Sequence, residues 1–316
     1  LAALAIYLFG RALGWEAVLG ALGRADPIWI VAASASAACC LCVWTLSWRH
    51  VLSTVGVGIP WRSLVVDYFA ATFVNYVTPL GRTSGAPVSA YILSTDHRAP
   101  YDESLATVAT VTTLNVAPML TFAGMGALSI ARAGDVPGRM TPVLAGVGTL
   151  CVATPLATLG TWRAREHVAD CISAVAGTLS ARTGLVDPVK IDRRVRGFFT
   201  ILDRVGRSRW ELLEVLTLSY VGWVLFAAPL WLAAKALGVH LDPLLVAFVV
   251  PASTLASVVP TPGGIGGVET AIVLLLTGLG GIAAPTAGAI ALLYRIAGYW
   301  FLMTLGGLAV LSVSTR

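Results

Sequence analysis

The chain has 316 residues, of which 57% are apolar and only 12% are charged. Soluble proteins carry about twice that charged fraction, so the composition excludes a soluble enzyme, a nucleic-acid-binding domain and a disordered scaffold. The mean hydropathy of +0.83 instead predicts a polytopic membrane protein built from helices. The formal net charge of +5 matters less than the positions of the basic residues.

Several apolar runs are long enough to cross a bilayer, which takes about 20 residues in a helix. In chain order these runs lie at Pro27–Trp48, Leu105–Ala131, Pro142–Trp162, Trp210–Ala234 and Pro285–Leu311. Leu1 opens inside an apolar run, so we expect Leu1–Phe9 to be the end of a further span. The sequence therefore predicts about six spanning helices.

Two apolar segments are broken. Ser63–Thr78 and Leu244–Val259 have only about 16 residues each, which is short for a crossing at about 1.5 Å per residue. Each leads through a Pro- and Gly-rich break into a second short apolar piece, Ala86–Ser94 and Val268–Ile282. A broken backbone at membrane depth has to be buried in protein or line a polar cavity. The segments therefore predict re-entrant hairpins or discontinuous helices.

The two breaks share the pattern Thr-Pro-x-Gly, at Thr78–Gly81 and Thr261–Gly264. If both are hairpins, they enter from opposite faces, which is the arrangement of an inverted repeat. If the first is one discontinuous crossing, the balance of charge across the membrane is unchanged, so both topologies stay open. The predicted fold is an all-α polytopic membrane protein with about six spanning helices and two broken or re-entrant hairpins.

Basic residues set the orientation, because Arg and Lys concentrate on the cytoplasmic side. Residues 163–209 hold ten of them: Arg163, Arg165, Arg182, Lys190, Arg193, Arg194, Arg196, Arg204, Arg207 and Arg209. This basic loop is therefore predicted to be cytoplasmic and the chain to be a multi-pass protein of the cell membrane. Tryptophans flank the same side as an aromatic belt would: Trp48, Trp61, Trp162 and Trp210.

Within the basic loop, apolar residues recur at helical spacing: Ile191, Val195, Phe198 and Leu202. This spacing predicts an amphipathic helix. Two interpretations stay open. The helix lies on anionic lipid, or the segment is an ordinary basic loop that enforces topology, which we favour.

Four charged residues interrupt the apolar runs, and one of them, Asp67, occupies the first half-helix. Arg82 and Glu269 follow the two breaks, and Arg295 lies inside the last span. An ionised group at the bilayer centre costs roughly 2.5–3.5 kcal/mol, so such residues are expected to be paired or to face an interior cavity. Either arginine can bind a phosphate through its planar guanidinium. Glu269 is expected to counter one of them or to take up a proton; alternatively, an Arg–Glu pair only locks helices together.

Backbone N–H groups at the start of the helix after each break form a ready anion site, and the glycines permit a close approach. The alternative is that proline and glycine only form a tight turn. The histidines are scattered, so we expect no catalytic or metal cluster and no cofactor. The candidate substrate-binding residues are Asn75, Gly81, Arg82, Gly85, Pro262, Gly263, Gly264, Gly266, Gly267, Glu269 and Arg295.

The stretch from Val259 to Glu269 closely resembles the signature of the lysylphosphatidylglycerol synthetase transmembrane, or flippase-like, domain family. The segment from Asn75 to Leu93 is similar to that family's first motif, and the segment from Arg295 to Gly307 to its last. The resemblance spans essentially the whole chain. Family members often have a second glycine and an acidic residue where this chain has Ser84-Gly85-Ala86, which leaves Arg82 to define the headgroup preference.

The resemblance implies the transbilayer movement of an anionic or phosphate-containing lipid, such as an aminoacylated phospholipid or a polyprenyl-phosphate-linked sugar. It implies one transmembrane domain over residues 1–316 that is not itself an enzyme. The expected partners are the membrane lipid and a separate glycosyltransferase or synthetase, with no nucleic acid, and an oligomer is compatible with the sequence. The alternatives are a membrane-embedded glycosyl or aminoacyl lipid transferase and a subunit that anchors such a synthase.

Overall fold

The computed structural model describes residues 15–78, 81–97, 99–134, 136–183, 187–256 and 261–314. Within these ranges every regular element is helical. Six helices are long and apolar enough to cross a membrane: Pro27–Thr54, Tyr101–Ala133, Thr141–Arg163, Arg209–Ala236, Pro262–Leu279 and Ala284–Val313. The predicted all-α polytopic fold is confirmed. The expected span at Leu1–Phe9 lies outside the described residues.

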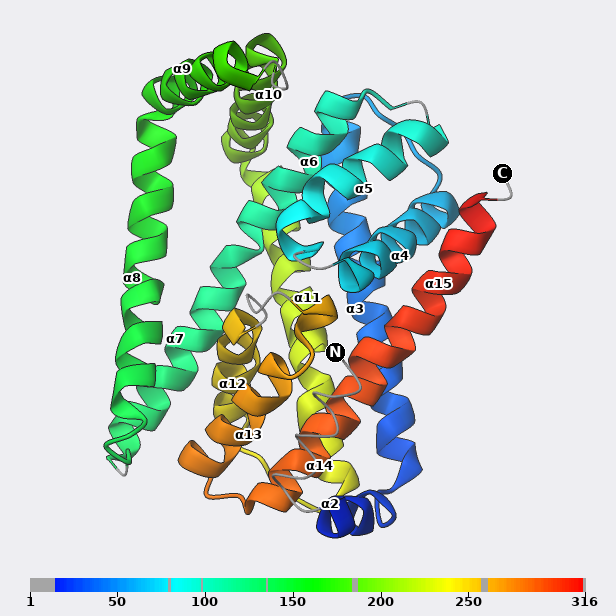
Figure 1. The fold of residues 1–316 in the computed structure, drawn as a ribbon, viewed down its shortest axis with the longest axis vertical. Coiled ribbons are helices and arrows are strands. Elements are labelled where there is room, and N and C mark those ends of the chain that lie inside the picture. The colour runs from blue at the N-terminus through cyan, green and yellow to red at the C-terminus, as the bar shows by residue number, and fades with distance from the viewer. Residues whose placement is uncertain are drawn as a thin grey trace.

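Long helical crossings run between the two ends of the molecule (Figure 1). Helix α2 (Trp15–Leu22) lies at the lower end in this view. The rising crossings are α3 (Pro27–Thr54), α8 (Thr141–Arg163) and the last span, in which α14 (Ala284–Arg295), η3 (Ile296–Trp300) and α15 (Phe301–Ser314) follow one another. The descending crossings are α6 (Tyr101–Leu114) with α7 (Val116–Ala133), and α11 (Arg209–Ala236).

Local sequence explains where several of these helices begin and break. Asp26 caps α3 by accepting the N–H of Ile28, and Pro27 occupies the first turn, where a missing N–H costs nothing. Pro118 cannot donate to the carbonyl of Leu114, which explains why the predicted span Leu105–Ala131 is divided into α6 and α7.

The broken segments form two hairpins. Helices α4 (Trp61–Val77) and α5 (Gly81–His97) pack on each other and both open toward the upper end. Helix α12 (Pro243–Leu255) and helix α13 (Gly267–Leu279) both open toward the lower end, with η2 (Pro262–Gly264) between them in sequence. The first segment is therefore a hairpin and not a discontinuous crossing. The tips meet where α4 contacts η2.

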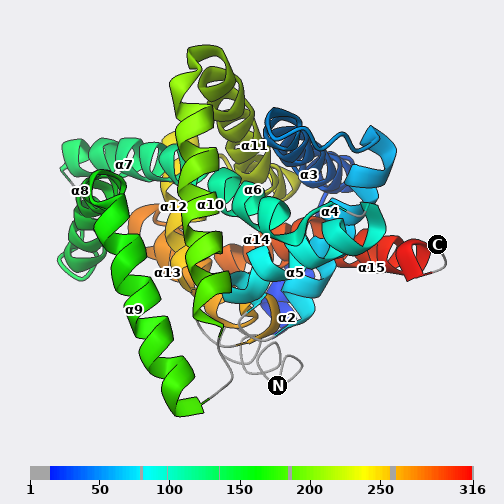
Figure 2. The same cartoon turned by 90° about the horizontal axis from the view of Figure 1, so that it is seen from above.

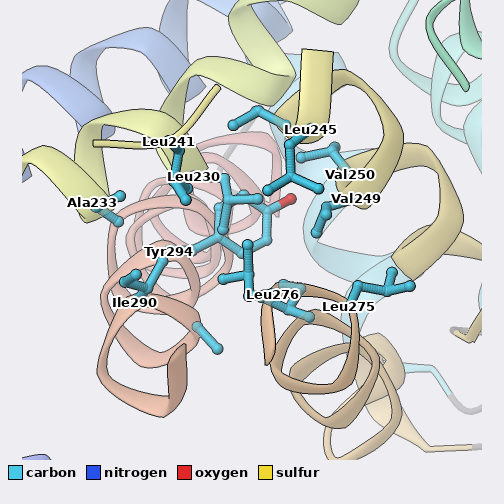
Figure 3. Packing of buried hydrophobic residues seen from close by; sticks show 14 of the residues in the cluster. Leu230, Ala233, Leu241, Leu245, Val249, Val250, Leu275, Leu276, Ile290 and Tyr294 are labelled. Carbon is cyan, nitrogen blue, oxygen red and sulfur yellow. The ribbon is translucent and has the colours of Figure 1, made fainter. Parts of the chain in front are cut away.

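The largest apolar core lies among α11, α12, α13 and α14 (Figure 3). Leu230, Phe248, Leu276 and Ile290 are fully buried in it. Gly126 of α7 lies against α12, where a Cβ atom would stand only 2.7 Å from the Cβ of Phe248. The second hairpin is thus held by tight packing on both sides.

Residues 163–209 form two helices, α9 (Arg165–Thr183) and α10 (Pro188–Arg207), across the upper end (Figure 2). Helix α10 covers the stretch where apolar spacing predicts a helix, and it packs against α6 and α9. Its residues Phe199, Ile201 and Val205 are buried. Arg193 and Arg194 bind Asp102 of α6, at 2.7 and 3.0 Å. The four residues of the predicted stripe are themselves half-buried, and Phe198 packs against the core that α6 helps to form, so protein covers part of this apolar face.

The predicted aromatic belt needs one correction. Trp48 is buried, with its ring centroid 4.5 Å from that of Tyr68, so it belongs to the core between α3 and α4. Trp162 and Trp210 are exposed at the ends of α8 and α11, as expected for a belt. The burial of Trp48 depends on Tyr68 of α4, and the apolar run around Trp48 gives no sign of this neighbour.

The contact of α7 with α12 predicts that Gly126→Ala destabilises the protein. An added Cβ forces the two helices apart, and such overpacking costs about 1–3 kcal/mol. Gly146→Ala in α8 is the matched control, because its Cβ meets nothing within 4 Å. Thermal unfolding of both variants in nanodiscs measures the difference. Equal midpoints for the two variants would contradict the packing described.

The hairpin topology predicts the sides from which engineered cysteines are labelled in whole cells. In a variant without the five native cysteines, Arg62→Cys and Thr95→Cys flank the first hairpin, whereas Gly138→Cys and His240→Cys lie at the other end. An impermeant maleimide is expected to label the second pair and not the first. The first pair lies at the same end as the basic loop 163–209, which is predicted to be cytoplasmic and therefore out of reach of the reagent. Labelling of only one member of the first pair would show a crossing in place of a hairpin.

Candidate functional site

A cavity of about 300 Å³ lies where the two hairpin tips meet. Asn75, Tyr76 and Thr78 line it from the first hairpin. Thr261, Gly263 and Gly264 line it from the second, and the last span adds the polar side chains Tyr294, Arg295 and Tyr299. Much of the remaining wall is apolar and comes from α3, α7, α11, α12 and α15. The cavity is therefore amphipathic and draws on both halves of the fold.

Glycine is required at the tip of the second hairpin. Gly263, Gly264 and Gly266 have φ angles of +59°, +66° and +89°, which side chains rarely adopt. A Cβ atom on Gly263 would also overlap the ring of Tyr299. The backbone is extended at Thr261, and the turn begins at Pro262. The carbonyl of Pro262 accepts the N–H of Ile265 at 3.2 Å. The chain thus brings its backbone directly against the last span.

A buried ion pair joins this tip to the last span. Nε of Arg295 donates to Oε1 of Glu269 at 2.6 Å, and the two residues are only 7% and 5% exposed. Nη2 of Arg295 also donates to the carbonyl oxygen of Gly263 at 3.0 Å. Of the two arginines that the sequence offered to Glu269, the structure therefore shows Arg295 as its partner.

Glu269 has a second role as the cap of α13. Its Oε2 accepts the N–H of Gly266 at 2.8 Å, so the carboxylate satisfies a backbone donor in front of the helix. Both carboxylate oxygens are thereby engaged. Two buried charges are tolerated because each meets a charge and at least one further hydrogen bond.

The turn after Arg295 is a π-helix over Ile296–Trp300. Such wide turns are frequent at functional sites because they re-aim side chains on one helix. Here the Arg295 guanidinium lies 4.1 Å from the centroid of the Tyr299 ring, a cation–π contact. The Tyr299 ring is 5.1 Å from that of Tyr76 in the first hairpin. One chain of contacts therefore runs from Glu269 to α4.

In the first hairpin, Asn75 faces the cavity and lies against Gly85. A Cβ atom on Gly85 would stand 3.2 Å from Nδ2 of Asn75, so glycine leaves space for the amide. Among the described residues, Oδ1 of Asn75 has no hydrogen-bond partner although it is buried. Gly81 and Arg82 begin α5, and their side-chain surroundings lie outside the described part of the chain.

The structure thus sorts the candidate residues into three groups. Asn75, Gly263, Gly264 and Arg295 line the cavity. Gly85 packs behind Asn75. The remaining described members build the second tip around the ion pair: Pro262, Gly266, Gly267 and Glu269.

The most important residue absent from the predicted set is Tyr299. It contacts Gly263, Arg295 and Tyr76, and thus joins both hairpins to the last span. Its position four residues after a membrane-embedded arginine was a usable signal, because residues at this spacing share a helix face. Tyr294 and Thr261, which also line the cavity, carry no comparable signal in the sequence.

Comparison with known proteins gives one consistent family. The lysylphosphatidylglycerol synthase TM region family matches residues 1–306. A UPF0104 membrane protein of Methanothermobacter thermautotrophicus is 24% identical over 92% of this chain and 87% of its own length. A UPF0104 membrane protein of Pyrococcus horikoshii is 22% identical, over 94% and 91%. Glycosyltransferase AglD of Haloferax volcanii is 25% identical over 93% of this chain but only 50% of AglD. No solved structure matches the chain.

The buried pair predicts a strongly non-additive response to mutation. Arg295→Met leaves the Glu269 carboxylate buried without its cation, which costs about 3–5 kcal/mol of stability. The double variant Glu269→Gln with Arg295→Met removes both charges and is expected to recover much of that loss. Unfolding midpoints in detergent measure the coupling, with Arg132→Met at an exposed position of α7 as control. If the loss of stability in the double variant equalled the sum of the losses in Arg295→Met and Glu269→Gln alone, the two residues would not be coupled.

Proposed function

Because the chain belongs to the lysylphosphatidylglycerol synthase TM region family, we propose that it moves a phosphate-containing lipid from one leaflet to the other. The observation that carries this proposal is the cavity where two hairpins from opposite ends meet, with a buried arginine in its wall. Opposed repeats of broken helices around a central site are a common construction of membrane transporters. The apolar part of the wall suits the proximal part of a lipid chain.

Arg295 is the proposed phosphate ligand. Its guanidinium lines the cavity while it binds Glu269 and the carbonyl of Gly263. A phosphate that takes a bidentate hold on Arg295 competes with both partners. Loss of the bond to Gly263 frees the second tip from the last span, so lipid binding and movement of this hairpin are linked. Arg82, in the first turn of α5, is proposed as a second phosphate ligand.

Glu269 is proposed to hold the site neutral when no lipid is bound. When the phosphate engages Arg295, the carboxylate keeps its bond from Gly266 and is left with a negative charge or takes up a proton. Tyr76 and Tyr299 offer ring faces beside the arginine, which suit a sugar or an aminoacyl amine on the headgroup. Transport would run down a lipid gradient or be driven by an ion or the membrane potential, because the sequence contains no ATP-binding motif.

The substrate class proposed is therefore an aminoacylated phospholipid or a polyprenyl-phosphate-linked sugar. The chain itself is proposed to be a transporter and not an enzyme, in the cell membrane with the basic loop 163–209 in the cytoplasm. The similarity to half of glycosyltransferase AglD favours a second candidate, in which this chain serves as the membrane part of a lipid-modifying transferase or anchors one. A separate synthetase or glycosyltransferase is then its partner.

Reconstitution into liposomes tests the proposal. The purified chain is expected to move a fluorescent phospholipid between leaflets, and Arg82→Ala, Arg295→Ala or Glu269→Ala to slow this movement more than about tenfold, because a hydrogen bond to a charged group is worth about 1.5–3 kcal/mol. Arg139→Ala, an exposed arginine between α7 and α8, is the control and is expected to behave as wild type. Unchanged rates in all three variants would remove the mechanism. A folded protein that moves no lipid would favour the anchoring role.

A further inference from the structure

Helix α9 follows directly on the upper end of α8. Helix α8 is long and apolar enough to span the bilayer, and it ends at Arg163 beside the exposed Trp162. Helix α9 then runs across the upper end of the molecule and does not continue the direction of α8 (Figures 1 and 2). Because the upper end of α8 marks the membrane boundary, α9 starts at that boundary and stays near it.

One face of α9 packs on α10. Ala169 and Ala176 are buried, at 1% and 4% exposure, and the two helices contact each other. The hydroxyl of Ser173 donates to Oδ1 of Asp192 on α10 at 2.8 Å. This face fixes the rotation of α9 about its own axis.

A second face of α9 is charged and lies in water. Arg196 of α10 binds Glu166 at 3.0 Å and Asp170 at 2.8 Å, and its Nε binds Asp192 at 2.9 Å. The side chains of Glu166 and Asp170 are 72% and 70% exposed. The hydrogen bond from Ser173, together with Arg196, lowers the pKa of the Asp192 carboxyl. Exposed charges of this kind require contact with water.

The third face of α9 is an apolar stripe in which Val168 is half-buried and three residues are exposed: Ile172, Val175 and Leu179. Ile172, Val175 and Leu179 are 39%, 67% and 48% exposed. At about 100° per residue, the stripe is centred about half a turn from Glu166 and Asp170 and about a quarter turn from the face on α10. Since the charged face is in water, the stripe points to the opposite side of the helix.

We propose that α9 is an interfacial helix whose apolar stripe, from Val168 to Leu179, is inserted into the bilayer leaflet at the upper end of the molecule. An amphipathic helix in this position buries its apolar side at the boundary between headgroups and acyl chains. The lipid-facing alternative in the sequence analysis concerned the stripe on α10, where Phe198 packs against the core that α6 helps to form. The occupant proposed is lipid and not a soluble partner, because a soluble protein would approach from the opposite, charged side.

This insertion also accounts for the position of α8. Among the described residues of α8, only Val147 is buried; the helix packs on α7 and α9, and Nε1 of Trp162 donates to Oδ1 of Asp203 on α10 at 2.7 Å. An inserted α9 holds the upper end of α8 at the membrane surface, while the Arg196 cluster joins α9 to α10. The inference stands whether or not the protein moves lipids.

Spin-label accessibility in vesicles of phosphatidylcholine and phosphatidylglycerol tests this proposal. Labels are placed at Ile172→Cys and Val175→Cys in the variant without native cysteines. Ala174→Cys is the matched control, because it is exposed on the same helix and lies on the side of the charged face. The stripe labels are expected to collide more often with oxygen than with a water-soluble nickel chelate, and the control label is expected to show the reverse.

Two outcomes would overturn the proposal. Frequent collision of the stripe labels with the nickel chelate would place the stripe in water. Protection of the stripe labels from both reagents would show that protein, such as a second copy of the chain, covers the stripe in place of lipid. A thermal midpoint equal to that of the unlabelled protein confirms that each labelled variant is folded, so both readings apply to the native arrangement.

Discussion

Two opposite charges in an apolar medium cannot be placed independently, and this constraint organises the centre of the molecule. Arg295 and Glu269 come from the last span and from α13, and they are stable at this depth only in contact. Their contact fixes where the second hairpin stops, because Arg295 also binds the carbonyl of Gly263. The glycines, the π-turn and Tyr299 are arranged around that meeting point. The cavity is the space left beside them.

Much of this arrangement could be predicted from the sequence because the relevant signals are local. The short apolar runs and the Pro- and Gly-rich breaks identified both hairpins, and the rarity of charge in the spans identified Glu269 and Arg295. The bounds of the long helices moved by six residues at most; the largest change is at the end of Pro27–Trp48, which became Pro27–Thr54. The sequence could not decide whether the first broken segment is a hairpin or a discontinuous crossing, because both topologies give the same balance of basic residues across the membrane.

What the sequence did not show depends on contacts between distant segments. The spacing of Tyr299 from Arg295 indicated a shared helix face, but the contacts of Tyr299 with Gly263 and Tyr76 join segments that lie far apart in the sequence. The apolar stripe on α10 was visible, yet its partner, α6, lies about 90 residues earlier, as the pairing of Arg194 with Asp102 shows. Trp48 was assigned to the membrane boundary, but its neighbour Tyr68 encloses it. Local sequence thus shows which residues are apolar or aromatic, but it does not show which distant segment packs against them.

The cap on α13 has an electrostatic consequence. Glu269 lies at the start of this helix, where aligned peptide dipoles sum to a partial positive charge. If Arg295 turns toward a ligand, the carboxylate therefore stays in a favourable potential and keeps the N–H of Gly266. The helix acts as a fixed counter-charge that no conformational change can carry away. When Arg295 moves from the Glu269 carboxylate to an anionic ligand, the carboxylate is then less exposed as an unpaired charge than it would be without the helix.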